Sequence, residues 1–380
     1  MPRSVIEAMA SYLRTGNSNT HGAFAASRDT DALIEEARRA AADLTGADPD
    51  EIVFGQNATT LLFSLSRAFA KTLRAGDEVV VTKLDHDANV RPWILAAEDA
   101  GASVKWVDVR EDDVTLDLDS LDTALSERTR LVAFTLASNA VGTIPPAREI
   151  VRRIHRAGAL AAVDGVHLAQ HRSLDLRESG ADILACSAYK FFGPHVGLLA
   201  VRRNLLERWT PYKLRPAPDS VPARWETGTL NHEGLAGLVA AVGYLEDLGR
   251  SFGTPSDATP RAALAAAFEA IAEHEHELGR RFLDGASAIP SLRLWGVSDS
   301  ERVGERTPTF AFRLGDQHPE KTATDLGDRG IFVWDGHYYA ITIMERLGLL
   351  GAGGAVRVGF CHYHTPDEVD RVLEDIASIA

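Results

Sequence analysis

Three apolar runs lie close together between residues 160 and 203, and they constrain the fold more than any other feature. The runs LAAVDG, DILACSA and GLLAVRR are nearly continuous in apolar side chains. Such runs fit strands that are covered on both faces, as in parallel sheets. Helical patterns such as DALIEEARRAAADLTG and AREIVRRIHRAGA alternate with strand-like segments upstream. The sequence therefore predicts an α/β fold around a parallel sheet.

The pattern changes after about residue 248. Residues 258–287 form one long helical stretch, and TPTFAFRL and GAVRVGFCHYH then alternate like half-exposed strands. The segment PDEVDRVLEDIASIA closes the chain as a helix. This mixture predicts a second, smaller α+β domain, with the boundary near LGRSFGTPSDATP.

The chain is acidic and poor in cysteine. It has 380 residues, a formal net charge of −14 and two cysteines. Nucleic-acid binding needs a basic surface, and Cys186 and Cys361 alone cannot form a disulfide framework or a thiolate zinc site. No apolar stretch reaches the length of a membrane span, and the N-terminus lacks the apolar core of a signal peptide. These features predict a cytoplasmic protein without nucleic-acid or membrane partners.

Polar side chains follow several predicted strands, at the sheet edge where open α/β folds bind ligands. The helix that starts at NATT offers free N–H groups and the hydroxyls of Thr59 and Thr60, which suit a phosphate. His86 and Asn139 follow two other strands. Taken singly, each of these is equally typical of a helix cap, an exposed loop or a turn.

Asp164 and Lys190 are more informative because each follows an apolar strand. A carboxylate there needs a cation or strong donors, and a lysine is rarely buried without a partner, although its ammonium can snorkel to the surface. His167 and His171 are four residues apart, but HLAQH lacks the glutamate of the HExxH pattern. We therefore expect no metal.

Together these strand ends fit pyridoxal 5′-phosphate (PLP). A lysine can form a Schiff base with its aldehyde, and an aspartate can keep its pyridine nitrogen protonated. Asp164 precedes Lys190 by 26 residues (190 − 164), which leaves room for one helix and one strand. The two would then lie on neighbouring strand ends. A nicotinamide cofactor is the alternative, but no GxGxxG follows a strand.

The chain resembles the class V aminotransferases of PLP fold type I, nearest to the cysteine desulfurase and selenocysteine lyase branch. The motifs that carry the resemblance span nearly the whole chain, in the family's order: NATT, DHDANVRPW, SNAVG, DGVH, SAYKFFGP, ETGTLN, GHYYA, VRVGF and TPDEVDR. The resemblance implies a large α/β domain over residues 16–248, with a mostly parallel seven-stranded sheet. Residues 1–15 and 262–380 would form the smaller α+β domain.

The resemblance also implies which residues hold the cofactor. Lys190 would be the Schiff-base lysine, Asp164 would pair with the pyridine nitrogen, and His86 would stack on the ring. His167 stands where the family often has a glutamine on the ring hydroxyl. The remaining implied cofactor contacts are Ala58, Thr59, Asn139, Ser187, Tyr189 and Thr229.

The substrate and the assembly follow from the same resemblance. Asn139 and Arg357 would hold the carboxylate of an amino-acid substrate, which suits the bidentate fork of arginine. Thr229 would reach the phosphate in the partner subunit, so the family pattern implies a homodimer with shared active sites. The amine of the substrate would displace Lys190 from the Schiff base to form an external aldimine, and the freed Lys190 would then remove the Cα proton.

The segment GHYYA departs from the family. Desulfurases of this branch resemble GHHCA there, and their cysteine receives sulfur as a persulfide, whereas this chain has Tyr339. Strand alternation would put Cys361 on the same face as Arg357, but about 13 Å away over four residues. Cys186 lies in an apolar strand. We therefore expect neither cysteine to carry a persulfide.

Several fates of the substrate stay open at this point. We favour β-elimination of the C–S lyase type, for example on a cysteine conjugate, with Tyr339 as an acid at the leaving group. An epimerase, a class V aminotransferase, and a desulfurase that uses another thiol are alternatives. A non-catalytic PLP-fold binding protein is a further one. Relatives also carry a small-residue loop before the first helix, so either this chain starts later or its site is more open.

Overall fold

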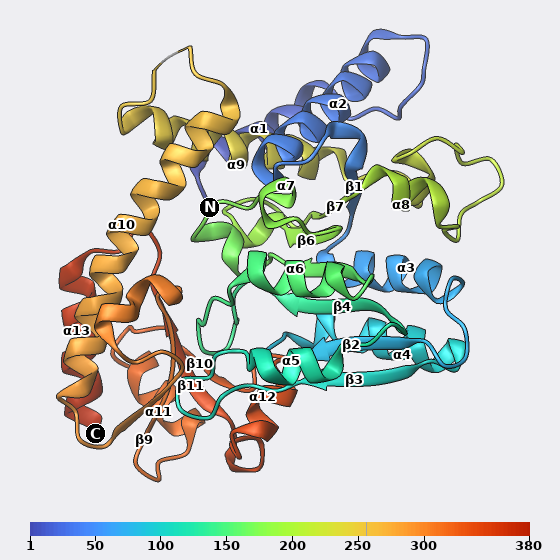
Figure 1. The fold of residues 1–380 in the computed structure, drawn as a ribbon. Coiled ribbons are helices and arrows are strands. Elements are labelled where there is room, and N and C mark those ends of the chain that lie inside the picture. Colours follow the sequence, from blue (N-terminus) through green and yellow to red (C-terminus); the bar gives the residue numbers. More distant parts are fainter. Residues whose placement is uncertain (256) are drawn as a thin grey trace.

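The fold is that of a computed structural model, which describes residues 1–255 and 257–380. A seven-stranded sheet forms its centre (Figure 1). The strand order is β1-β7-β6-β5-β4-β2-β3. The strands are β1 (Ile52–Gly55), β2 (Glu78–Thr82), β3 (Ser103–Val107), β4 (Thr129–Thr135), β5 (Leu160–Asp164), β6 (Ile183–Ser187) and β7 (Gly197–Val201).

The sheet is mostly parallel, as the sequence predicts. The β2–β3, β2–β4, β4–β5 and β5–β6 pairs are parallel, and β7 runs antiparallel to both of its neighbours. The carboxyl ends of β4, β5 and β6 therefore lie side by side at one edge of the sheet. The predicted α/β fold with a mostly parallel seven-stranded sheet is confirmed.

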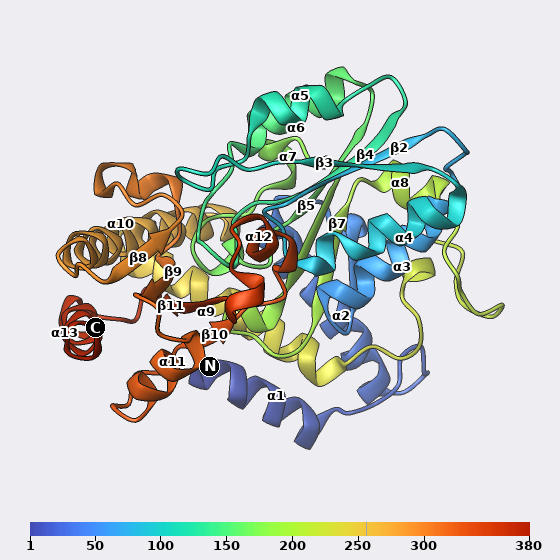
Figure 2. The same cartoon turned by 90° about the horizontal axis from the view of Figure 1, so that it is seen from below.

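Alternate side chains of the central strands enter two separate cores, which explains the continuous apolar runs. In β5, Ala161 and Val163 belong to one core and Ala162 belongs to the other. The first core is shared with α2 (Ala25–Thr45), α5 (Leu118–Ala124), α6 (Ala147–Arg156) and α9 (His232–Ser251). The second is shared with α3 (Ala58–Ala70), α4 (Arg91–Ala100) and α8 (Arg203–Arg208). Figure 2 shows α5 and α6 on one side of the sheet and α3 and α4 on the other.

A second, antiparallel sheet has the order β10-β11-β9-β8. One of its faces packs against three helices, which lie on the left side of Figure 1. Phe310, Phe312, Val356 and Val358 enter that core, so the residues between them point to the opposite face. The strands are β8 (Leu292–Trp295), β9 (Thr309–Leu314), β10 (Trp334–Gly336) and β11 (Ala355–Gly359), and the helices are α10 (Pro260–Ser287), α11 (Pro319–Gly327) and α13 (Pro366–Ile379).

The remaining helices are α1 (Arg3–Thr15), α7 (Leu176–Ser179) and α12 (Ile341–Arg346). Helix α1 packs on α9, and Val5 is buried in the core of the large sheet. The division into 16–248 and 1–15 with 262–380 stays a prediction, and its boundary segment contains Ser256, which lies outside the described residues. In the described ranges, none of the helices is long and apolar enough to span a membrane.

Candidate active site

A cavity of about 510 Å³ opens at the carboxyl ends of the parallel strands. All the site residues predicted from the sequence line it except Thr229: Ala58, Thr59, His86, Asn139, Asp164, His167, Ser187, Tyr189, Lys190, Tyr339 and Arg357. Thr229 lines a second cavity beside the start of α3, together with Asn57 and Thr60. The structure thus brings the predicted residues together, while their individual roles stay predictions.

Asp164 is the last residue of β5 and forms part of the cavity floor. Its side chain is buried, and Oδ1 accepts a hydrogen bond of 2.8 Å from the N–H of Val166. Burial raises the pKa of this carboxyl to about 6, against that hydrogen bond and the charge of Lys190, which lower it. A cation at the carboxylate would stabilise its charged form.

A second carboxyl group, that of Asp85, is buried close enough to Asp164 to repel its charge. Asn89 Nδ2 donates to Asp85 Oδ1 at 2.7 Å, and the hydroxyl of Thr82 bonds the other oxygen. Burial, with a contribution from Asp164, raises the pKa of Asp85 to about 8. Behind the floor of the cavity, the charge of Asp164 therefore disfavours ionisation of the buried Asp85 carboxyl.

Lys190 ends a single 3₁₀ turn that follows β6, so its amine enters the cavity beside Asp164. Burial lowers the pKa of the Lys190 ammonium, and the nearby charge of Arg357 lowers it further, while Asp164 acts in the opposite direction. The amine nitrogen lies 5.4 Å from the centre of the Tyr189 ring. A lowered pKa increases the fraction of neutral, nucleophilic amine.

His86 caps the short turn after β2, and its Nδ1 accepts from the N–H of Ala88 at 3.0 Å. Burial, followed by the charges of Lys190 and Arg357, lowers the pKa of His86 to about 4, so its ring is neutral. The ring stacks on that of Tyr339, with centroids 5.6 Å apart and planes at 19°. The flat ring of His86 is thus held in place at the wall of the cavity.

The start of α3 forms one corner of the cavity. Asn57 caps the helix and its Oδ1 accepts from the N–H of Thr60 at 2.9 Å, so the interpretation of this segment as a helix cap is confirmed, while its phosphate contacts stay a prediction. The hydroxyl oxygen of Ser187 accepts from the N–H of Ala58 at 2.9 Å. These contacts join the end of β6 to the helix start, where the positive end of the helix dipole favours a phosphate.

Arg357 projects from β11, on the sheet face opposite the core of the smaller sheet. Its Nη1 donates to the carbonyl of Asn139 at 2.7 Å, and its guanidinium lies 4.6 Å from the centre of the Tyr338 ring. Asn139 Nδ2 donates to the Tyr338 carbonyl at 2.8 Å, while Asn139 Oδ1 is buried without a hydrogen-bond partner in the described residues. A cation and an unsatisfied acceptor therefore face the same cavity.

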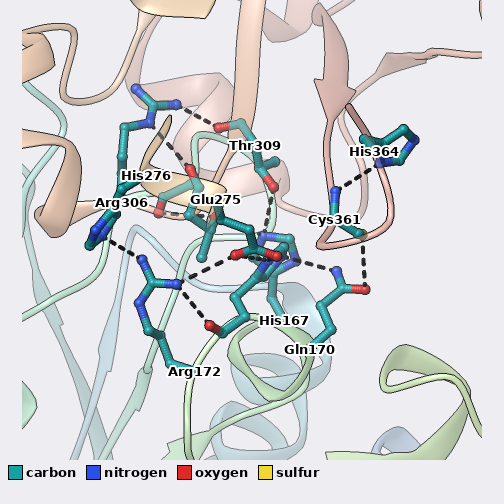
Figure 3. A network of polar contacts seen from close by, with 12 residues as sticks. His167, Gln170, Arg172, Glu275, His276, Arg306, Thr309, Cys361 and His364 are labelled. Atoms are coloured by element: carbon teal, nitrogen blue, oxygen red, sulfur yellow. Dashed lines mark hydrogen bonds and ion pairs between the residues drawn. The ribbon is translucent and has the colours of Figure 1, made fainter. Parts of the chain in front are cut away.

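His167 lines the back of the cavity, and its Nε2 lies 3.1 Å from the Thr309 hydroxyl (Figure 3), a contact that no pattern in the sequence predicts. Burial lowers the pKa of His167 well below its usual value. His171, four residues on, is instead buried 3.0 Å from the carboxylate of Glu275 in α10. The described residues contain no cluster of three or more His, Cys, Asp or Glu side chains arranged to hold a metal.

Neither cysteine lines this cavity. Cys186 is buried within β6, and Cys361 lies near Gln170, with its sulfur 3.7 Å from the amide oxygen (Figure 3). Burial raises the pKa of the Cys361 thiol to about 12. The strand predicted through Cys361 is wrong in its extent, because β11 ends at Gly359 and the chain then turns. Cys361 therefore does not continue the strand face that carries Arg357.

The segment 334–339 forms the rim of the cavity, and sequence reasoning identified only Tyr339 in it. Tyr338 and Tyr339 have φ values of 53° and 58°, a left-handed backbone that is uncommon outside glycine. Hydrogen bonds hold this turn: Asp87 N–H donates to the Tyr339 carbonyl at 2.7 Å, and the Tyr338 hydroxyl donates to the carbonyl of Ala355. Trp334 and His337 complete the rim. The local signal that could have pointed to Trp334 is the pair of aromatic residues, Phe332 and Trp334, on either side of Val333.

The cavity suits the cofactor expected from the sequence. The buried carboxylate of Asp164 would gain the cation it lacks from a protonated pyridine nitrogen, and the neutral His86 ring offers a face for stacking. The start of α3 with Ser187 would hold the phosphate, and Lys190 supplies the amine. Donors, acceptors and charges therefore match the different parts of PLP.

Comparisons with known proteins agree with this site. The family model described as Aminotransferase class-V matches residues 1–372. A probable cysteine desulfurase of Streptomyces coelicolor is 31% identical, covering 100% of this chain and 89% of that protein. A cysteine desulfurase of Enterobacter sp. is 30% identical, covering 100% of this chain and 90% of that protein.

Solved structures of cysteine desulfurases have the same fold. The apo enzyme of Thermococcus onnurineus superposes with a TM-score of 0.89 at 26% identity, covering 100% of this chain and 92% of that one. The Escherichia coli cysteine desulfurase CsdA, in an S-sulfonic acid form, superposes with a TM-score of 0.83 at 26% identity, covering 99% of this chain and 91% of that one. The chain therefore belongs to the class-V aminotransferase family of PLP-dependent enzymes, among relatives of the cysteine desulfurases.

Proposed function

We propose that this enzyme cleaves the carbon–sulfur bond of a cysteine-derived amino acid by β-elimination, without a persulfide cysteine. The observation that carries the proposal is the position of Tyr339, whose side chain lines the cavity where the resemblance predicts the sulfur-accepting cysteine. Both cysteines lie outside the lining, and burial raises the pKa of each thiol. Elimination needs no acceptor thiol.

The substrate is held at its carboxylate. Arg357 offers a planar fork of donors, and the contact of its Nη1 with the Asn139 carbonyl fixes the guanidinium. The Tyr338 ring supports the guanidinium from one side. These contacts orient the substrate so that its Cα lies toward Lys190.

Lys190 moves the proton at Cα. Burial and then the charge of Arg357 lower the pKa of its ammonium, and a lowered pKa favours the neutral amine that can act as a base. Bound PLP supplies an electron sink for the pair left at Cα.

Tyr339 then gives a proton to the departing sulfur. The bond between Cβ and sulfur breaks, the sulfur leaves with the bonding pair, and the phenol O–H protonates it. The overall reaction consumes one water and yields a thiol, pyruvate and ammonium. Atoms and charge balance without an external oxidant or reductant.

The test is a comparison of products on the PLP-loaded protein. L-cysteine, S-methyl-L-cysteine and S-phenyl-L-cysteine are incubated separately, and pyruvate, alanine, free thiol and D-amino acid are measured. We expect pyruvate and thiol in equal amounts. Alanine with protein-bound persulfide would contradict the proposal in favour of desulfuration, and D-amino acid alone would indicate an epimerase.

We further propose that the active enzyme is a homodimer. Thr229 lines the second cavity, next to the start of α3. It does not line the cavity that contains Lys190 in the same chain. A neighbouring subunit seated there would bring its Thr229 toward the phosphate corner. Light scattering should give twice the mass of one chain, and a monomer that retains full turnover would refute this arrangement.

A further inference from the structure

The rim of the cavity carries large aromatic side chains that are left in solvent. Trp334 is 69% exposed and Tyr339 is 67% exposed, although both line the cavity. Aromatic side chains contribute much of the energy of binding when a ligand covers them, and exposed apolar surface at a cleft marks a binding site. The amino acid's own carboxylate and amine need neither residue.

The strand register places Trp334 beside the residue expected to hold the substrate carboxylate. Trp334 of β10 lies directly opposite Arg357 of β11. Directly opposite residues of antiparallel strands share one face, with their Cβ atoms about 5 Å apart. Val333 packs on the core of the smaller sheet, so its neighbour Trp334 points away from that core. The indole therefore stands at the cavity mouth, next to Arg357.

Tyr339 approaches the mouth from the other end of the rim. Its ring covers one face of His86 at 5.6 Å, and its backbone is fixed by the hydrogen bond from Asp87. The left-handed backbone conformation of Tyr338 and Tyr339 is unfavourable in free energy for a residue other than glycine, and it persists because the surrounding contacts hold it. Both aromatic side chains are thus carried by backbone that is pinned by pairing or hydrogen bonds.

We propose that Trp334, assisted by Tyr339, selects substrates whose sulfur carries an aryl group or a similarly flat apolar group. An S-aryl cysteine anchored by Arg357 extends its ring from Cβ toward the mouth, where the indole covers it. The inference rests on the proposed carbon–sulfur cleavage and adds the substrate class. It also fits the chemistry, because an aryl thiolate is a better leaving group than an alkyl thiolate.

A small molecule fits this surface better than a protein partner does. Trp334 and Tyr339 line the same cavity as Lys190 and Arg357, so the aromatic surface is continuous with the reacting groups. Phe332, which is 91% exposed and lies two residues before Trp334, does not line the cavity. Phe332 therefore provides a matched control for an exposed aromatic outside the site.

The test measures binding rather than turnover. L-homophenylalanine and L-norvaline are the carbon isosteres of S-phenyl- and S-methyl-L-cysteine, and neither has a sulfur leaving group. Calorimetric titration of the PLP-loaded protein should give about tenfold or more tighter binding of homophenylalanine. Trp334→Ala should reduce that preference to about twofold, Trp334→Phe should retain most of it, and Phe332→Ala should leave it unchanged.

The outcomes separate the two proposals. Equal affinity for the two amino acids in the unmodified protein overturns the aryl selectivity alone, and this result is also expected if the rim serves a protein partner. Binding of neither amino acid overturns the amino-acid function together with the selectivity. Tyr339→Phe keeps the ring but removes the hydroxyl, so we expect it to retain the preference for homophenylalanine.

Discussion

The floor of the cavity (Asp164, Ser187 and Lys190) and its rim (segment 334–339) are built in opposite ways. The floor follows the ends of buried parallel strands, and burial shifts the pKa of its ionisable groups. The rim comes from the smaller sheet and a strained turn, and two of its aromatic side chains are more than two-thirds exposed. The floor carries the family's motifs, whereas the rim departs from them at Tyr339.

This contrast indicates how one fold can support different reactions. The proposed removal of a Cα proton uses an amine and a carboxylate held at rigid strand ends, together with a phosphate held at the start of α3. The fate of the substrate after that step depends on what stands near its Cβ, which is the rim. Changes at the floor should therefore abolish turnover, and changes at the rim should alter the products or the choice of substrate.

The largest effect is expected for Lys190→Ala at the floor. Loss of the amine should lower turnover by about 10⁴-fold, because Lys190 is the group proposed both to form the Schiff base and to remove the proton at Cα. Steady-state pyruvate release measures this. Lys83→Ala is the control, since its ammonium pairs with Asp108 at 2.8 Å and lies outside the lining. Residual turnover within tenfold of the unmodified enzyme would exclude Lys190 as the base.

A smaller effect is expected for Tyr339→Phe at the rim. Removing the phenol should lower kcat for a poor alkyl leaving group by about 10²-fold, and less for an aryl thiolate, which leaves without help. The ratio of kcat values for S-methyl- and S-phenyl-L-cysteine measures this difference. An unchanged ratio would mean that Tyr339 gives no proton to the leaving sulfur.

Arg357→Lys should affect binding of the substrate carboxylate more than the chemical step. A lysine cannot reproduce the bidentate fork, so we expect KM to rise about tenfold with kcat within a factor of three. Because Nη1 also holds the Asn139 carbonyl, circular dichroism should accompany the kinetics. A fall in kcat with constant KM would place Arg357 in the chemistry instead.

The mildest effect concerns the stability of the cofactor-free protein. The pKa of Asp85 is raised to about 8 from about 3.9 in an unfolded chain. The folded state therefore retains a proton that the unfolded state loses, and Asp85 contributes stability at low pH that is lost as the pH rises from about 4 to 8. Asp85→Asn mimics the protonated form.

The measurement is the Tm of both proteins from pH 5 to pH 9. The two curves should nearly coincide at pH 5, and Asp85→Asn should be more stable by on the order of 5 °C at pH 8. Parallel curves across the range would show that Asp85 is ionised in both states. Because the charge of Asp164 contributes to the raised pKa of Asp85, the difference between the two curves reports the coupled pair of carboxyl groups.

Much of the floor could be predicted from the sequence, for a physical reason. Each of its residues follows an apolar run whose burial on both faces is visible in the sequence, and Asn57 is a strong helix-cap residue. The parallel order then brings the strand ends together. The motif resemblance supplied the roles and Arg357, which no local pattern singles out.

The rim could not be predicted in the same way. Strand β10 has three residues and exists because it pairs with β11, a contact between distant parts of the chain. Tyrosine has no preference for a left-handed backbone, so the conformation of Tyr338 and Tyr339 is set by their partners. The sequence does not mark the end of β11 at Gly359, because the alternation of apolar residues continues to Phe360, after the pairing stops.

The most direct test of cleavage without a persulfide cysteine uses a variant that has no cysteine at all, Cys186→Ala with Cys361→Ala. PLP-loaded protein is given S-phenyl-L-cysteine, and thiophenol, pyruvate and alanine are quantified together. We predict thiophenol and pyruvate in a one-to-one ratio, at a rate within about twofold of the unmodified enzyme, because neither thiol lines the cavity. Loss of product release in a folded variant, or alanine in place of pyruvate in the unmodified enzyme, would contradict the account.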